Sequence, residues 1–338
     1  MGSTFLATTS DWISKLLTWV TWKTFLTLLS AFCFVRVVYD EINKRTQRLP
    51  MIGERVLILG ASSGVGRAMA KQYAARGARV CVVGRREALL AEVREECLQA
   101  RRDVPGTADH DIAALPGDFT SVADMINIRT FLEEAWGGLD TLVVAAGVSA
   151  LKPLLAVTGV QGNEDSTKEG IQRTVDIAAA ATRGNYVGPL IAAVTLIPTL
   201  SRTSKAPAIL LLNSVAAIIP APTRTLYAST KAASLLLYQA LSIEHPNIAF
   251  THFLPATIEG DFRASAVDSG PVRELDPNKH GLKREKVAKR AIEAVDMGEK
   301  NVIMPFIPYH FAHFLYWMMG PSGSVVESMA RKKYNYNV

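Results

Sequence analysis

Short, almost unbroken apolar runs recur through the middle of the chain, and they constrain its fold more than any other feature. They alternate with segments that have the spacing of helices, at residues 64–76, 86–102 and 122–136. Runs without polar alternation are typical of strands buried on both faces, as in a parallel sheet covered by helices on both sides. The runs lie at residues 55–60, 78–84, 112–118, 140–147, 206–214, 247–255 and 301–305. The sequence therefore predicts a doubly wound α/β domain over about residues 54–305.

The composition excludes several classes of protein. The chain has 338 residues, of which 49% are hydrophobic, so it can bury a large core and is not disordered. Its net charge of +6 is mild, and the excess cations lie near two apolar stretches, which favours a membrane surface and no nucleic acid. Cys33, Cys81 and Cys97 are an odd, scattered set, which indicates a reducing compartment. Because no zinc-like Cys/His spacing occurs, we expect no metal.

An apolar stretch near the N-terminus predicts a membrane anchor. Residues 16–35 contain one charge, Lys23, and as a helix they would extend about 30 Å, the thickness of the hydrocarbon core. Three tryptophans cluster around its start, as in an interfacial aromatic belt: Trp12, Trp19 and Trp22. A single span is favoured, and a helix lying in the interface and a cleaved signal peptide are the alternatives.

The charges beside this stretch predict its orientation. Lys15 precedes it, whereas four cations follow it: Arg36, Lys44, Arg45 and Arg48. By the positive-inside rule, the main domain would face the cytosol.

A second apolar stretch lies near the C-terminus. Residues 306–319 have no Asp, Glu, Lys or Arg but contain six aromatic side chains, and fourteen residues are too few to span a membrane. A buried helix is one interpretation. The aromatic density and the basic tail at Arg331, Lys332 and Lys333 favour a segment that dips into the headgroup region. We divide the chain into an anchor with a basic juxtamembrane linker (1–48), a catalytic domain (49–305) and an apolar segment with a basic tail (306–338).

A glycine-rich turn follows the first predicted strand directly. In "LILGASSGVGRAMA", Gly60, Gly64 and Gly66 lie directly after that strand and at the opening of the next helix, where backbone N–H groups can approach a pyrophosphate. Ser62 and Ser63 add hydroxyl donors. This context predicts a Rossmann-type dinucleotide site.

The end of the second strand predicts which dinucleotide binds. The strand is followed by Arg85 and Arg86 rather than by Asp or Glu. An acidic residue there would repel a 2′-phosphate, whereas arginine forks match it. The sequence therefore favours NADP, with two surface arginines as the alternative.

Tyr227 and Lys231 are four residues apart in "LYASTKAAS". On a helix this spacing places both side chains on one face. A ketone that accepts a hydride becomes an alkoxide and needs a proton, but a free tyrosine has a pKa near 10. We expect the Lys231 ammonium to favour the phenolate and to lower the pKa of Tyr227.

These motifs together resemble the short-chain dehydrogenase/reductase family, over about residues 54–305. "GASSGVG" is similar to the family's cofactor turn. Ser214 in "LNSVAA" lies thirteen residues before Tyr227, as in the family, and Asn185 lies in "RGNYVG". The resemblance implies that Asn185, Ser214, Tyr227 and Lys231 are catalytic, with Tyr227 as the acid.

The resemblance also implies individual roles. Ser214 would donate to the carbonyl oxygen, Asn185 would position a water that returns the proton, and Lys231 would hold the nicotinamide ribose. Asp118 in "PGDFT" matches the residue that contacts the adenine amino group. The chain departs from the family's pattern at two places. Val144-Ala145-Ala146-Gly147 stands where the family has Asn-Asn-Ala-Gly. In "PATIEG", Ala256 replaces the usual Gly, and Gly260 stands where a Thr often contacts the carboxamide. The implied cofactor-binding residues are Gly60, Ser62, Ser63, Gly64, Val65, Gly66, Arg85, Arg86, Asp118, Gly147, Tyr227, Lys231, Pro255 and Ile258.

The N-terminal anchor and the tail are most similar to the membrane-bound 11β-hydroxysteroid-dehydrogenase-like branch. This implies NADP(H)-dependent interconversion of a ketone and a secondary alcohol on a lipid-like substrate, such as a steroid or retinoid, at the endoplasmic reticulum membrane with the catalytic domain in the cytosol. A 3-ketodihydrosphingosine-type reductase is one alternative. A non-catalytic NADP-binding scaffold is another, although the four matched catalytic residues argue against it. A homodimer is compatible with the sequence, which does not identify the substrate or the direction of reaction.

Overall fold

The computed structural model of the chain describes residues 22–42, 44–106, 108–160, 164–272, 276–318 and 323–336. Its centre is a seven-stranded sheet in which each pair of neighbouring strands is parallel. In sheet order the strands are β3 (Ile112–Pro116), β2 (Arg79–Gly84), β1 (Arg55–Leu59), β4 (Thr141–Val144), β5 (Ala208–Leu212), β6 (Ala249–Pro255) and β7 (Asn301–Met304). The order reverses between β1 and β4, where open α/β sheets bind ligands at the carboxyl ends of the strands. The predicted doubly wound sheet is confirmed.

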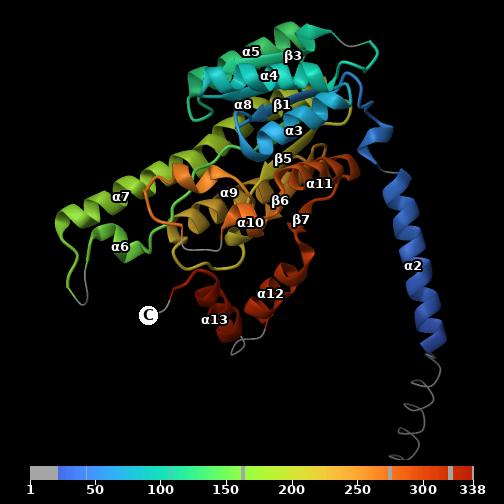
Figure 1. The fold of residues 1–338 in the computed structure, drawn as a ribbon. Coiled ribbons are helices and arrows are strands. Elements are labelled where there is room, and N and C mark those ends of the chain that lie inside the picture. The colour runs from blue at the N-terminus through green and yellow to red at the C-terminus, as the bar shows by residue number, and fades with distance from the viewer. Residues whose placement is uncertain are drawn as a thin grey trace, which may run out of the picture.

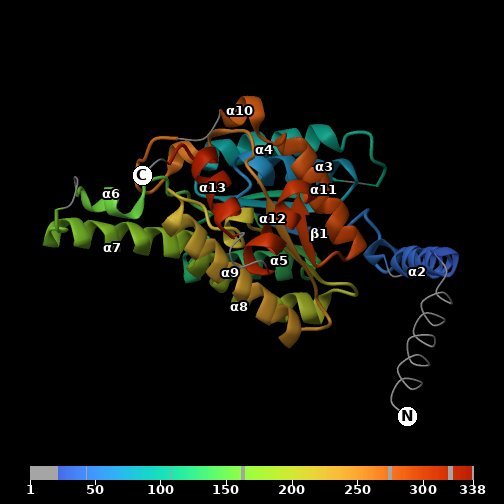
Figure 2. The same cartoon turned by 90° about the horizontal axis from the view of Figure 1, so that it is seen from below.

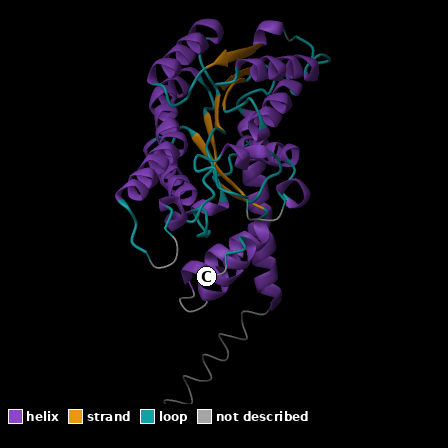
Figure 3. Cartoon of the chain, turned by 60° about the vertical axis from the view of Figure 1, so that its left-hand side comes forward, coloured by secondary structure: helices purple, strands orange, loops and turns teal. Residues whose placement is uncertain are grey.

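Helices cover both faces of the sheet (Figures 1 and 3). The face with Val56 and Ile58 packs against α3 (Gly64–Ala75), α4 (Glu87–Ala100) and α11 (Arg284–Met297). The opposite face, with Leu57 and Leu59, packs against α5 (Val122–Trp136), α8 (Gly188–Thr203) and α9 (Thr225–Glu244). These side chains of β1 are fully buried on both faces, which is why the strand reads as an unbroken apolar run.

Shorter elements complete the domain. The long helix α7 (Lys168–Thr182) runs through a π-helical turn, η3 (Arg183–Val187), into α8, and its far end projects from the domain with α6 (Leu154–Thr158) (Figures 1 and 2). The predicted irregular segment after β6 contains η5 (Asp261–Ser265) and α10 (Pro277–His280). The remaining 3-10 turns are η1 (Arg45–Gln47), η2 (Asp109–Asp111) and η4 (Val215–Ala217).

Arg45, which the prediction placed in the linker of the segment 1–48, is part of the folded domain. Arg45 is 5% exposed. Its guanidinium pairs with Glu54 at 2.7 Å and donates to Thr141 Oγ1 at 2.7 Å and to the Ala206 carbonyl at 2.7 Å. Because a buried cation needs such partners, Arg45 contributes to the fold and not to a membrane-facing charge cluster.

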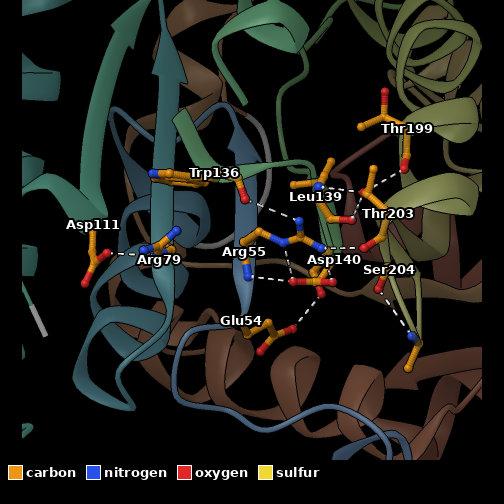
Figure 4. A network of polar contacts seen from close by, with 12 residues as sticks. Glu54, Arg55, Arg79, Asp111, Trp136, Leu139, Asp140, Thr199, Thr203 and Ser204 are labelled. Atoms are coloured by element: carbon orange, nitrogen blue, oxygen red, sulfur yellow. Dashed lines mark hydrogen bonds and ion pairs between the residues drawn. The ribbon is translucent and has the colours of Figure 1, made fainter. Parts of the chain in front are cut away.

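A second ion pair lies beside this one at the amino ends of the strands. Arg55 holds both carboxylate oxygens of Asp140 at 2.8 Å and donates to the Thr203 carbonyl at 2.7 Å, as Figure 4 shows. The two charged networks tie β1, β4 and the end of α8 together at the edge opposite the carboxyl ends.

Helix α2 (Trp22–Ile42) stands beside the domain (Figure 1). Within the described residues, no helix has both the length and the apolarity that crossing a membrane requires. The predicted anchor at residues 16–35 lies outside the described residues over 16–21, as do Trp12 and Trp19, so the anchor stays a prediction.

The C-terminal segment forms α12 (Phe306–Met318), which lies next to β7, and α13 (Gly323–Lys333), which packs against α12. No residue of α12 is buried, so the interpretation as a buried helix is wrong. Its exposed side chains include Phe311 at 61% and Trp317 at 70%. On its inner side, His313 Nδ1 lies 3.0 Å from the Ile218 carbonyl, which holds α12 against the loop before α9.

Candidate active site

The glycine-rich turn between β1 and α3 lies at the carboxyl edge of the sheet. The Gly60 and Ala61 amides both donate to the Val83 carbonyl, at 3.0 and 3.1 Å, so the turn is fixed to the end of β2. Gly60 has a φ of 89°, and a Cβ there would lie 2.6 Å from the Ala146 backbone. Only glycine therefore allows this close approach to the loop after β4. The first-turn amides of α3, including that of Val65, are left to face this edge.

Arg86 lies across this turn. Its Nη2 donates to Ser62 Oγ and to Ser63 Oγ, both at 2.9 Å. Arg85 is exposed beside it. The structure thus brings one of the two predicted arginines to the glycine turn, together with both predicted serines.

Three further predicted cofactor residues lie at the same edge of the sheet. Asp118 follows β3, and its Oδ1 accepts from the Thr120 amide and hydroxyl at 2.9 Å each. Pro255 is the last residue of β6, and Ile258 forms a bridge with Leu282 just beyond it. The glycine-rich turn, its two serine hydroxyls, Arg86 and the first-turn amides of α3 fit a nicotinamide dinucleotide that lies along the carboxyl ends of the strands.

Asn185 is placed by the π-helical turn between α7 and α8. It is 1% exposed, and its Oδ1 accepts from the Val148 amide at 2.8 Å. Its Nδ2 donates to the Val148 carbonyl at 3.0 Å and to Thr230 Oγ1 at 3.1 Å. A π-helical turn inside a helix frequently marks a functional site. Both Nδ2 protons are used within the protein, so a water could bind this side chain only by donating to Oδ1.

Gly147, Asn185 and Lys231 converge from three elements. A Cβ at Gly147 would lie 2.9 Å from Asn185 Oδ1 and 3.3 Å from Lys231 Nζ. Lys231 Nζ donates to the carbonyl of Leu212, the last residue of β5, at 3.1 Å. Because the side chain is only 6% exposed, burial lowers the pKa of Lys231 to about 8.

Ser214 and Tyr227 form the centre of the site. Ser214 lies two residues after the end of β5, and its Oγ accepts from the Ala216 amide at 3.2 Å. Burial raises the pKa of Tyr227, while its hydrogen bond with Ser214 and the charges of Arg224 and Arg263 act against that rise. The expected lowering by Lys231 is therefore wrong for this structure. The ammonium is directed at the Leu212 carbonyl, and the cations that act on the phenol are two arginines.

Three residues near Tyr227 were missed by the sequence reasoning. The Phe262 ring packs edge-on against Tyr227 at 6.1 Å between centroids, and Arg263 follows it in η5. Arg224 Cζ lies 5.8 Å from the Tyr227 ring centroid. The three-residue spacing from Arg224 to Tyr227 on one helix could have indicated their proximity, but no local pattern places Phe262 or Arg263 there.

The site supports proton transfer beside a bound dinucleotide. Tyr227 carries a phenol proton and is hydrogen-bonded to Ser214, and both residues follow β5 in the chain. In the part of the chain that the structure describes, no group of three His, Cys, Asp or Glu side chains could hold a metal ion.

Comparisons with known proteins agree with this geometry. The profile of the short chain dehydrogenase family matches residues 54–269, more than half of the chain. The 11-beta-hydroxysteroid dehydrogenase-like 4A protein of Arabidopsis thaliana is 31% identical over 211 residues, which are 61% of this chain and 62% of that protein. The match thus spans less than two thirds of that relative.

Solved structures share the fold. A short chain dehydrogenase/reductase from Burkholderia phymatum in complex with NAD has a TM-score of 0.64, with 18% identity, covering 79% of this chain and 95% of that one. A short chain dehydrogenase from Burkholderia cenocepacia in complex with NADP has a TM-score of 0.60, with 18% identity, covering 82% of this chain and 99% of that one. The chain belongs to the short-chain dehydrogenase/reductase family, and its relatives include 11β-hydroxysteroid-dehydrogenase-like proteins.

Proposed function

We propose that the protein is an NADP(H)-dependent oxidoreductase that interconverts a ketone and a secondary alcohol on a lipid-like substrate. The observation that carries the proposal is that the hydrogen-bonded pair Ser214 and Tyr227 occurs together with a glycine-rich turn to which Arg86 is bonded. A steroid-like substrate is suggested by the name of the Arabidopsis relative.

NADP is favoured over NAD by the end of β2. A carboxylate there would bind the 2′-hydroxyl of NAD, but this chain has Arg85 and Arg86. Arg86 is already held at the turn by Ser62 and Ser63, so its guanidinium is available to a 2′-phosphate at little cost in side-chain entropy.

The chemistry follows from the positions of the side chains. A bound nicotinamide would supply or accept the hydride. Tyr227 gives its proton to the carbonyl oxygen during reduction and takes it back during oxidation. Ser214 donates to the same oxygen, where negative charge develops. Lys231 binds the Leu212 carbonyl and Asn185 binds the Val148 backbone, so both side chains stabilise the site. Lys231 is also within reach of a ribose at Gly147.

We also propose that the enzyme works at a membrane, that of the endoplasmic reticulum, with its catalytic domain in the cytosol. The exposed aromatic side chains of α12 support a contact with lipid, since a large apolar surface facing water is unfavourable. Arg331, Lys332 and Lys333 at the end of α13 are suited to anionic headgroups.

A substrate screen tests the proposed function. Full-length protein in detergent is mixed with NADPH and a panel of two lipid ketones, cortisone and 3-ketodihydrosphingosine, and NADPH oxidation is followed at 340 nm. Turnover of the steroid ketone supports the proposal. Exclusive turnover of 3-ketodihydrosphingosine supports the sphingoid alternative. Tight NADPH binding without turnover of any ketone would contradict the proposal in favour of a scaffold.

A further inference from the structure

Arg224 is a buried cation at the start of α9 to which the proposed mechanism assigns no role. It is 4% exposed. Its Nη1 donates to Ser149 Oγ at 2.8 Å and to the Ala150 carbonyl at 3.4 Å. Both acceptors belong to the segment that follows β4, and Ser149 is itself fully buried. The guanidinium is therefore fixed inside the site, between the loop after β4 and the catalytic helix.

The backbone before Arg224 adopts an uncommon conformation. Thr223 has a φ of 63°, in the left-handed region that a β-branched residue rarely occupies, and it is 4% exposed. Such conformations persist where the surrounding structure enforces them, and they cluster at functional sites. The next residue turns directly into α9, where the Ala228 amide donates to the Arg224 carbonyl at 2.6 Å. Thr223 thus directs Arg224 inward.

Arg224 acts on Tyr227 from close range. Its Cζ is 5.8 Å from the centroid of the Tyr227 ring. The ring of Phe262 packs edge-on against the same tyrosine, with an interplanar angle of 65°. Because Arg224 is almost fully buried, its charge acts where the effective dielectric constant is low and electrostatic interactions are stronger.

Four polar or charged groups act on the pKa of Tyr227. They are Ser214 after β5, Arg224 at the start of α9, Arg263 in η5 and Tyr334 after α13. Lys231, one turn further along α9, directs its ammonium at the Leu212 carbonyl. Ser214 and the two arginines lower the pKa of Tyr227, whereas burial and Tyr334 raise it. Arg224 is the more deeply buried of the two arginines, and its Nη1 donates to Ser149 Oγ at 2.8 Å.

We propose that Arg224 is a positioning residue that stabilises the phenolate of Tyr227 and so sets the pH range in which this side chain transfers its proton. During reduction, a hydride adds to the carbonyl carbon and the Tyr227 proton moves to the carbonyl oxygen, which leaves a phenolate beside the guanidinium. During oxidation, the phenolate accepts the proton of the alcohol while the hydride leaves the same carbon. The catalytic part of this inference rests on the proposed function.

The direct test is a titration of the Tyr227 phenolate in full-length protein. The chain has nine tyrosines, so the signal at 295 nm is taken as the difference between each protein and the same protein with Tyr227→Phe. Arg224→Met should raise the midpoint by about one pH unit, because an opposite charge at this range shifts a pKa by about 1 to 3 units. Arg224→Lys, which keeps the charge, should stay close to the wild type.

Two further variants separate charge from packing. Ser149→Ala removes the short bond to Arg224 and should raise the midpoint by less than Arg224→Met does. The matched control is Arg94→Met, because Arg94 also donates to backbone carbonyls, those of Ile112 and Asp109, but lies on α4. It should leave the midpoint unchanged. An unchanged midpoint in both Arg224→Met and Ser149→Ala, or an equal shift in Arg224→Lys and Arg224→Met, would overturn the proposal.

The pH dependence of turnover gives an independent readout. The ketone that the wild-type enzyme reduces is supplied as its alcohol with NADP⁺, and the rise of kcat with pH is followed. In Arg224→Met this rise should move up by about one pH unit, so that oxidation at a fixed pH below the midpoint falls about tenfold. A merely structural role would change thermal stability or KM and leave the midpoint in place. If the wild type turns over no ketone, the proposed function fails, while the phenolate titration still decides the role of Arg224.

Discussion

Burial of Lys231 has an energetic cost that depends on pH. Its pKa is lowered to about 8 in the folded protein, from 10.5. Below pH 8 the Lys231 ammonium is charged in both states, buried in the folded chain and hydrated in the unfolded chain. Between pH 8 and 10.5 only the unfolded chain is protonated, so the stability of the wild type rises with pH across this window.

Lys231→Met should therefore stabilise the protein while abolishing turnover. At pH 7 we expect a gain in unfolding free energy of about 2 kcal/mol. This is less than the fall in the pKa of Lys231 from 10.5 to about 8 would give alone, since the Leu212 carbonyl loses its donor. The gain should shrink as the pH rises from 8 towards 10.5. Denaturant unfolding at pH 7 and pH 10 measures it. A variant that is equally destabilised at both pH values would show that burial of the ammonium is not costly.

Arg86 and Arg85 give a matched pair for the cofactor preference. Arg86→Asp places a carboxylate beside Ser62 and Ser63, where it should repel a 2′-phosphate and accept from a 2′-hydroxyl. The ratio of kcat/KM for NADPH to that for NADH should fall at least about tenfold, which corresponds to about 1.4 kcal/mol. Arg85→Asp should have the smaller effect, because Arg86 is the arginine bonded to the two serines of the turn. Equal effects, or none, would count against the role of Arg86.

At the scale of elements, regular patterns were predictable and long-range contacts were not. The apolar runs located all seven strands, because strands buried on both faces lack polar alternation, and α5 was predicted at residues 122–136, where it occurs. The π-helical turn at Asn185 has helical sequence on both sides, so nothing local marks it. Arg45 looked like one basic residue among several, because its partners Thr141 and Ala206 are distant in the chain.

The short turn η1 should carry much of the stability at the amino ends of the strands. Arg45→Met would leave Glu54 without one of its two cations in a buried position, and breaking a buried pair costs about 3 kcal/mol. We expect that loss in unfolding free energy, with NADPH affinity unchanged because the pair lies at the edge opposite the site. Arg48→Met, at an exposed position in the same segment, is the control. If the two variants have equal stability, the Arg45 network does not hold this edge together.

At the scale of the whole molecule, the exposed face of α12 predicts a membrane contact in addition to the N-terminal segment. Protein lacking residues 1–42 keeps Arg45 and should still float with anionic liposomes at low salt. Replacing Phe311, Phe314 and Trp317 with serine in this truncated chain should abolish flotation, because all three are at least half exposed. A truncated protein that stays at the bottom of the gradient would contradict the second contact.

The central claim is that this fold carries out hydride transfer with Tyr227 as the proton donor, and isotope transfer tests it most directly. Full-length protein is incubated with the substrate panel and NADPH that carries deuterium at the transferable position of C4, and the products are examined by mass spectrometry. We predict an alcohol that has gained one deuterium on the former carbonyl carbon. With Tyr227→Phe we predict unchanged NADPH affinity and turnover lower by several orders of magnitude. Deuterated alcohol formed at the wild-type rate by Tyr227→Phe would contradict the account.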